Sequence, residues 1–274
     1  MSRAATANAE TTGARTTGAR GGWSSVTAHL LLQYRRVWVG SAISSFLAPL
    51  MYLAGMGFGL GLLVDAGGGG LEGVPYVVFV VPGVLAATTL QVAAGETTFP
   101  VMGAIKWQRT YYGMLATPLR VRDVVVGHQV FVLLRVTIAA VVFLAVAAAL
   151  GTVRSWWSLA AVPVAMIGGM AFATCCYAFA VQLESDRGIV LMLRFVVMPM
   201  TLFSGTFFPI TQLPGWLQPV AWLTPLWHTV DASRALMLGT ATVAGVGAHV
   251  AYLLGWLVVG YLASVRLLRR RMVI

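Results

Sequence analysis

The chain has 274 residues, of which 59% are hydrophobic and 9% are charged, and its mean hydropathy is +0.85. An ordinary soluble domain carries roughly 25% charged residues, so this composition excludes that class and predicts an all-α, polytopic integral membrane protein. The 18 basic residues outnumber the 8 acidic ones. Because the arginines lie at the edges of apolar runs, where the positive-inside bias places them, we expect no nucleic-acid partner.

The N-terminal residues 1–22 are polar, small and basic, and they contain the repeated sequence TTGAR at 11–15 and 16–20. They have no apolar core of the kind found in signal peptides, so we expect a disordered tail in the cytoplasm. The remaining residues, 23–271, are expected to form one transmembrane domain. Its first part, Trp23 to Val37, has apolar residues at every third or fourth position, which is typical of an amphipathic helix lying in the cytoplasmic interface.

Apolar runs long enough to cross about 30 Å of hydrocarbon follow one another along the transmembrane domain. We expect six spans, at about 38–64, 76–99, 124–150, 159–183, from 189 onward, and 250–265. Both termini are expected in the cytoplasm, since this arrangement puts nearly every basic cluster inside. The loop 103–123 and the C-terminal run 266–271 are then cytoplasmic, and Arg154 and Arg234 are the external exceptions.

Three charged residues within or near the ends of these spans need an explanation. Arg135 is about a dozen residues into the third span, near the middle of the bilayer, where an arginine costs at least about 2.5 kcal/mol. It should therefore face protein or water. Glu96 ends the second span, and we expect it to pair with a basic residue of the neighbouring loop. Arg194 is close enough to the surface to snorkel.

The outer segment 209–238 combines prolines with tryptophans. Prolines interrupt helices, tryptophans prefer the headgroup level, and irregular backbone at membrane depth needs protein or water around it. We therefore expect one or two short helices that dip into the outer leaflet or lie on it. The residues expected to shape and anchor them are Pro209, Pro214, Trp216, Trp222 and Trp227.

Three polar residues in the same segment, His228, Asp231 and Arg234, recur at every third position. A helix would place them on neighbouring faces, so we expect a local polar network that holds the turn, with a role in substrate exit as the alternative. Hydrolase chemistry is not indicated, because no recognisable nucleophile elbow accompanies them.

Two stretches carry a resemblance to a known family. MLATPLRVRDVVVGHQV lies at 114–130, and FSGTFFPITQLPGWLQPVAWLTPLWHTVDASRALMLG lies at 203–239. Over about 23–271 the chain resembles the permease subunits of type-2 ABC exporters, the group of nodulation-factor and anthracycline exporters. The resemblance implies two permease chains, two ATP-binding subunits, and outward movement of a lipid-like, glycolipid or amphiphilic drug substrate across the inner membrane. It does not name the substrate.

The sequence also indicates that the energy for transport comes from another protein chain. No G-x-x-x-x-G-K-[S/T] sequence occurs, and the single lysine, Lys106, follows Gly103 in another pattern, so a phosphate-binding loop is lacking. We expect no cofactor or metal in this chain, and ATP with magnesium in the partner ATPase. An ion-driven carrier would show repeated halves and midplane acids. A membrane-embedded lipid-modifying enzyme would show clustered His or acidic residues, to which only the group at His228 comes near.

The resemblance also implies roles for two sets of residues. Within the loop 103–123 it implies a coupling helix that inserts into a groove of the ATPase, an interface that mixed aromatic and basic side chains suit. An interfacial loop with snorkelling arginines is the alternative. The expected coupling residues are Trp107, Arg109, Tyr111, Tyr112, Met114 and Leu115. The expected substrate path consists of Arg135, Phe203, Phe207 and Phe208. For Arg135 the alternative is a structural role, in which it bonds to helix carbonyls at the seam between the two permease chains.

Overall fold

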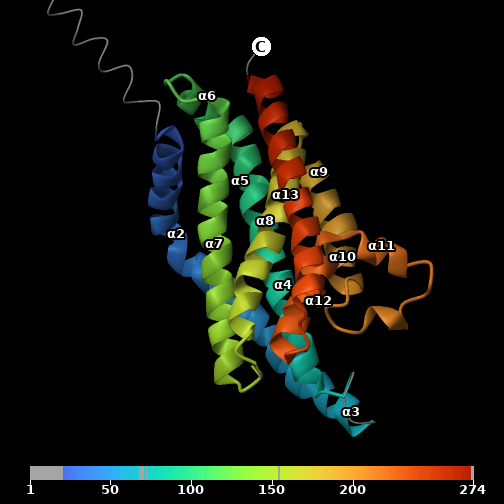
Figure 1. Ribbon diagram of the computed structural model, residues 1–274. Helices are drawn as coiled ribbons and strands as arrows, with labels where there is room; N and C mark the ends of the chain where they lie inside the picture. The colour runs from blue at the N-terminus through green and yellow to red at the C-terminus, as the bar shows by residue number, and fades with distance from the viewer. Residues whose placement is uncertain (1–20, 68–70, 72, 154, 273–274) are drawn as a thin grey trace, which may run out of the picture.

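The computed structural model describes residues 21–67, 71, 73–153 and 155–272 (Figure 1). These residues are almost all helical, which confirms the all-α prediction. The expected cytoplasmic tail lies outside them, apart from its last two residues.

Four of the described helices are long and apolar enough to cross a membrane. They are Tyr76–Trp107, which comprises α4 (Tyr76–Thr97), α5 (Phe99–Met102) and η2 (Gly103–Trp107), then α7 (Val121–Ala149), α8 (Ser158–Gln182) and α13 (Val243–Met272). Figure 1 shows them side by side along the length of one bundle. They correspond to the second, third, fourth and sixth predicted spans.

The first predicted span belongs to a longer helix than expected. α2 (Gly22–Tyr52), η1 (Leu53–Leu60) and α3 (Gly61–Ala66) follow one another without a break, so the amphipathic helix and the span are continuous. In Figure 1 the first part of α2 stands beside α7, and the later part passes behind the bundle to α3.

Close packing explains why α2 begins alongside α7. A Cβ atom on Gly127 of α7 would lie 2.6 Å from the carbonyl oxygen of Trp23 and 2.6 Å from Cβ of Val26, so only glycine permits this approach. The Thr27 hydroxyl donates a hydrogen bond to the Gly127 carbonyl at 2.9 Å. The two helix backbones are therefore in contact near their N-terminal ends.

The fifth predicted span corresponds to α9 (Arg187–Met192), η3 (Leu193–Val197) and α10 (Met198–Phe203), which run on as one helical stretch. At 1.5 Å per residue this stretch is about 25 Å long, shorter than the four spanning helices. The count of six crossings stays a prediction.

α8 lies at the centre of the bundle and packs against α13, α4, α12 and α7. Small residues bring the backbones together at these contacts. A Cβ atom on Gly168 would meet the Thr229 side chain of α12, and one on Gly260 would lie 2.3 Å from the Thr174 hydroxyl and 2.9 Å from the Cys175 nitrogen. Interior helices therefore approach one another through glycine and threonine.

The outer segment forms a 3-10 turn, η4 (Ile210–Gln212), and two helices, α11 (Gln218–Trp222) and α12 (Pro225–Leu238). Pro219 and Pro225 occupy the first turns of α11 and α12, where the missing N–H group costs nothing. The Thr224 hydroxyl caps α12 by accepting from the Trp227 N–H at 3.2 Å. The prolines therefore start these helices.

The two outer helices have different surroundings. α12 is a bundle helix, since it packs against α4, α8 and α13 and buries Leu226 and Val230. α11 projects from the side of the bundle (Figure 1). Trp216 and Trp222 are 75% and 46% exposed, so they are available to lipid, as anchors at the headgroup level would be.

Candidate functional site

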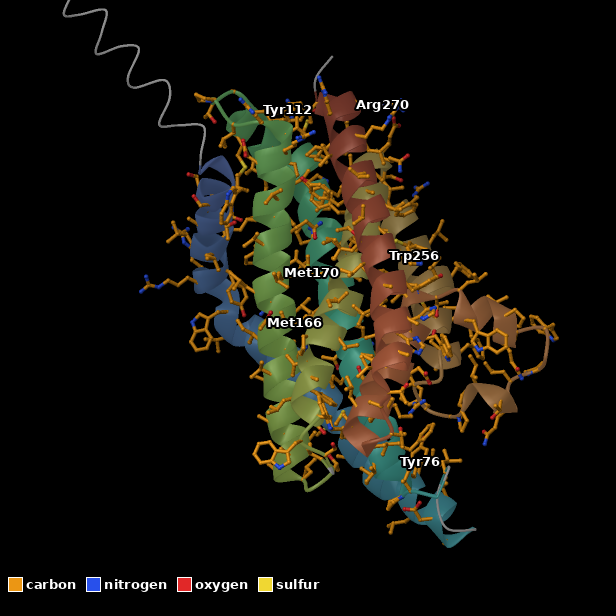
Figure 2. The ribbon with its side chains drawn as sticks, in the orientation of Figure 1. Tyr76, Tyr112, Met166, Met170, Trp256 and Arg270 are labelled. Carbon is orange, nitrogen blue, oxygen red and sulfur yellow. The ribbon has the colours of Figure 1, made fainter. Side chains whose placement is uncertain are left out.

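The predicted coupling loop forms a sharp turn at one end of the bundle. η2 ends at Trp107, and α6 (Thr110–Leu115) begins after Arg109, whose φ of 53° lies in the left-handed region. The side chains of Trp107 and Tyr112 are 62% and 47% exposed, and Arg109 is exposed as well. Tyr112 lies at the same end of the molecule as Arg270 (Figure 2). This end therefore presents two aromatic rings and a guanidinium group.

Tyr111 points the other way, contrary to its expected place among the surface residues. Its side chain is 1% exposed and belongs to a buried cluster with residues of α7, α8 and α13, against which Met114 and Leu115 also pack. Burial raises the pKa of its phenol. In a six-residue helix only one face meets the core, and Tyr111 occupies it while Tyr112 does not.

The hydroxyl group of Tyr111 reaches His128 of α7, which is 1% exposed. The oxygen lies 2.8 Å from Nδ1 of His128, and Nε2 of the same ring lies 2.9 Å from the carbonyl oxygen of Glu96. A carbonyl oxygen only accepts, so Nε2 carries the proton and Nδ1 accepts from the tyrosine. α6 is thereby joined through α7 to the end of α4.

Glu96 is paired, but its partner is Arg135 of α7 instead of the loop residue we expected. Nε of Arg135 donates to Oε1 of Glu96 at 2.9 Å, and the two side chains are 6% and 21% exposed. The guanidinium group also donates to the hydroxyl of Tyr34 and lies 4.3 Å from the centre of its ring. The pair therefore connects α2, α4 and α7 in the bundle interior.

The structure separates Arg135 from Phe207, two of the residues expected along the substrate path. Arg135 lies at Glu96, near the end of α4, whereas Phe207 packs against a buried cluster that includes Phe79 near its start. At 1.5 Å per residue these two points on α4 are about 25 Å apart. Phe203 is 38% exposed. Phe208 is half-buried, and Arg194 is exposed on η3, where snorkelling remains an expectation.

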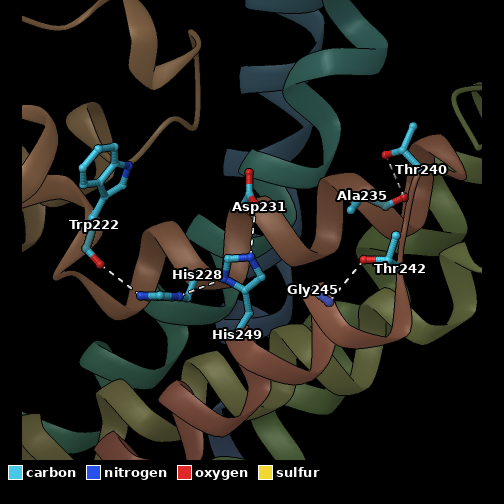
Figure 3. Close-up of polar contacts among 8 residues, drawn as sticks. All are labelled: Trp222, His228, Asp231, Ala235, Thr240, Thr242, Gly245 and His249. Atoms are coloured by element: carbon cyan, nitrogen blue, oxygen red, sulfur yellow. Dashed lines mark hydrogen bonds and ion pairs between the residues drawn. The ribbon is translucent and has the colours of Figure 1, made fainter.

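His228 and Asp231 take part in a polar network, but the third member is a residue that sequence reasoning missed (Figure 3). His249 of α13 places Nδ1 2.8 Å from Nδ1 of His228 and Nε2 3.2 Å from Oδ2 of Asp231. Arg234 bonds instead to the carbonyl of Gly205 and lies over a phenylalanine ring. No local pattern could have identified His249, because it lies on another helix.

The hydrogen bonds of this network limit where its protons can lie. A carbonyl oxygen only accepts, so Nε2 of His228 donates to the Trp222 carbonyl at 3.0 Å, and Nε2 of His249 donates to the Asp231 carboxylate. The two Nδ1 atoms then share one proton. The hydrogen bond from His249 lowers the pKa of Asp231, and burial together with the charge of His249 lowers the pKa of His228.

Aromatic rings surround the network. Tyr252 stacks on His228 with ring centres 3.9 Å apart, and Trp227 contacts both histidines edge-on. The Tyr252 hydroxyl donates to the Leu223 carbonyl at 2.8 Å. The network thus joins α12 and the loop before it to α13. Its role in this arrangement is to hold these segments together. Within the described ranges, no group of three or more His, Cys, Asp or Glu side chains could hold a metal ion.

Comparison with known proteins gives one family. The family model described as "ABC-2 type transporter" matches residues 23–238. Nodulation protein J of Rhizobium meliloti (strain 1021) is 33% identical over 251 residues, which cover 91% of this chain and 94% of that protein. Nodulation protein J of Rhizobium leguminosarum bv. viciae is 34% identical over 250 residues, with 91% and 95% covered. The inner membrane transport permease YadH of Escherichia coli (strain K12) is 24% identical over 222 residues, with 78% and 82% covered.

Proposed function

Because the chain belongs to the ABC-2 type transporter family, we propose that it is the permease subunit of an ATP-driven exporter. Two copies of it and two ATPase subunits, which bind ATP and magnesium, move a lipid-like, glycolipid or amphiphilic drug substrate outward. Both termini lie on the cytoplasmic side of the inner membrane. The family and the apolar helices support a transport permease embedded in the membrane.

The observation that carries the proposal is the exposed group Trp107, Arg109 and Tyr112, which we call the coupling surface. Aromatic and arginine side chains provide much of the binding energy in protein interfaces. The left-handed backbone of Arg109 is an uncommon conformation that costs of order 1–3 kcal/mol and is found at functional sites. We infer that the turn is shaped to present the coupling surface to the ATPase.

Replacement of two aromatic residues tests this inference. Trp107→Ala with Tyr112→Ala should lower co-purification of the ATPase at least about tenfold, since two interface anchors of more than 1 kcal/mol each are lost. The fold should survive, because both rings are largely exposed. The measurements are the ATPase recovered with tagged permease and the thermal stability of the permease alone.

The chain offers a matched control in Trp156 and Trp157, which are 89% and 66% exposed in the turn before α8. That turn lies at the opposite end of the bundle from α6 (Figure 1). Trp156→Ala with Trp157→Ala should leave ATPase recovery unchanged. Full recovery with the coupling-surface variant, or an equal loss with the control, would contradict the proposal.

A further inference from the structure

A groove of about 1000 Å³ separates the start of α7 from the end of α13. One wall is the loop before α7 together with the first turn of α7, which contribute Leu119 and Val121, and the other is the last turns of α13, which contribute Leu262 and Val265. Val121 and Val265 also pack against the buried cluster that contains Tyr177. The volume is at the upper end of the range for small-molecule sites, and these side chains make its deeper part apolar.

The rim of the groove is basic. Four exposed arginines line it, two from each wall: Arg120, Arg122, Arg266 and Arg269. Within the part of the chain that the structure describes, ion pairs join Arg135 to Glu96 and His249 to Asp231, and none includes a rim arginine. Asp123 is the acidic neighbour in the chain, and its carboxylate accepts the backbone N–H of Arg120 at 2.9 Å.

The order of residues along α13 gives the groove a polarity. Leu262, Val265, Arg266 and Arg269 follow the helical spacing of three and four residues and form one stripe. The leucine and valine lie deeper in the bundle, and the arginines lie toward the C-terminal end, where Arg270 marks the end of the molecule in Figure 2. An apolar section followed by a cationic one matches a lipid with an anionic headgroup.

We propose that this groove binds an anionic phospholipid of the inner leaflet. An acyl chain lies along Leu262 and Val265, and the headgroup phosphate is held between arginines of the two walls. The positive-inside bias explains why arginines are found at this end of the protein. It does not explain why two segments about 140 residues apart in sequence bring four of them around one apolar groove.

The lipid would have a structural consequence. α13 packs mainly on α8 and has little direct contact with α7, so the two walls of the groove are joined chiefly through α8 and the buried cluster that contains Tyr177. A phosphate bonded to both walls would connect α13 to the loop that carries α6. This inference does not rest on the proposed function, because it concerns the permease chain alone.

The test uses the purified full chain in detergent, with lipid binding followed by native mass spectrometry. Dioleoylphosphatidylglycerol should bind, and dioleoylphosphatidylcholine and inorganic phosphate should not compete with it. Arg266→Gln with Arg269→Gln should weaken phosphatidylglycerol binding about 25-fold, at about fivefold for each arginine near an anionic lipid. Leu262→Asn, at a 60% exposed position, should weaken it too while leaving both walls charged.

The matched control is Arg35→Gln with Arg36→Gln, which removes two adjacent exposed arginines from α2, outside the groove. It should leave phosphatidylglycerol binding within about twofold of the parent, since only nonspecific attraction is lost. Equal binding of the two lipids, equal loss in the two arginine pairs, or competition by phosphate alone would overturn the proposal. A groove variant that binds lipid normally but no longer recovers the ATPase would also overturn it, because the groove would then be part of the interface with the ATPase.

Discussion

Two adjacent tyrosines in α6 have opposite surroundings, one in the bundle interior and one on the surface. Tyr111 is 1% exposed and bonds to His128 through its hydroxyl, whereas Tyr112 is 47% exposed. Replacement of the first disturbs the interior, and replacement of the second alters the surface. A variant that combines Trp107 and Tyr111 would therefore confuse loss of folding with loss of ATPase binding.

Conservative substitutions separate these two positions. Tyr111→Phe removes one hydroxyl and leaves Nδ1 of the buried His128 without its donor, which should cost about 1–3 kcal/mol of stability. Tyr112→Phe removes the same atom from an exposed ring and should change stability by less than about 0.5 kcal/mol. Thermal unfolding of the two purified variants in detergent measures the difference. Equal shifts would mean that the bond between Tyr111 and His128 is absent in solution.

His249 is the other residue whose role depends on its neighbours. It donates from Nε2 to Asp231 and shares a proton with His228 between their Nδ1 atoms, so the two rings together hold one proton more than two neutral histidines. Since the Asp231 carboxylate balances that charge, the group as a whole is neutral. This neutrality lets two histidines and an aspartate lie against the rings of Trp227 and Tyr252.

Among the helices, contact between backbones determines how α8 and α13 pack. A Cβ atom at Gly260 would lie 2.3 Å from the Thr174 hydroxyl, and the Ser264 hydroxyl of α13 donates to the Thr174 carbonyl at 2.9 Å. In lipid, helices are held together by close packing of small residues and by hydrogen bonds, because burial from water contributes little there. The closest approach in this pair is therefore also the most sensitive to added volume.

Two glycines of α13 provide a paired test of this contact. Gly260→Ala should lower stability by about 1–3 kcal/mol, because the added methyl group forces the helices apart. Gly255→Ala adds the same group where nothing lies within 4 Å, and it should be neutral or stabilising by up to about 1 kcal/mol through helix propensity. Thermal unfolding in detergent checks both. A Gly260 variant as stable as the Gly255 variant would show that the close contact is not maintained.

For the whole molecule, the two ends of the bundle carry different chemistry. The coupling surface, the turn at Ser185 and the C-terminal arginines share one end, since Lys106 donates to the carbonyl of Glu184 and Arg271 donates to that of Leu183. α3 and the turn before α8 lie at the other end (Figure 1). From the positive-inside bias we expect the first end to lie in the cytoplasm.

Cysteine labelling in intact cells tests that assignment. A cysteine at Gly67, exposed after α3, should react with a membrane-impermeant thiol reagent, and one at the exposed Ser185 should react only after the cells are opened. The parent protein, with its own Cys175 and Cys176 in α8, supplies the background. The reverse pattern would invert the topology and remove the coupling surface from the reach of a cytoplasmic ATPase.

Hydrophobicity and charge along the sequence predicted the class of protein and four of its spanning helices, because both properties act locally. The prolines at the starts of α11 and α12 were predicted as interruptions for the same reason: each acts on its own turn of helix. That the helix expected at 23–37 continues into the first span was not predicted, since the close packing of α2 on α7 involves residues about 100 positions apart.

The sequence by itself determined that the chain lies in a membrane, where its apolar helices run and that its family is recognisable, since each of these depends on short runs of residues. Only the tertiary structure decided that Arg135 pairs with Glu96, that His249 joins His228 and Asp231, and that Tyr111 is buried beside an exposed Tyr112. The physical reason is the same in each case. A polar side chain in a helical bundle is satisfied by whichever group the neighbouring helix presents, and helix packing, not sequence distance, determines that neighbour.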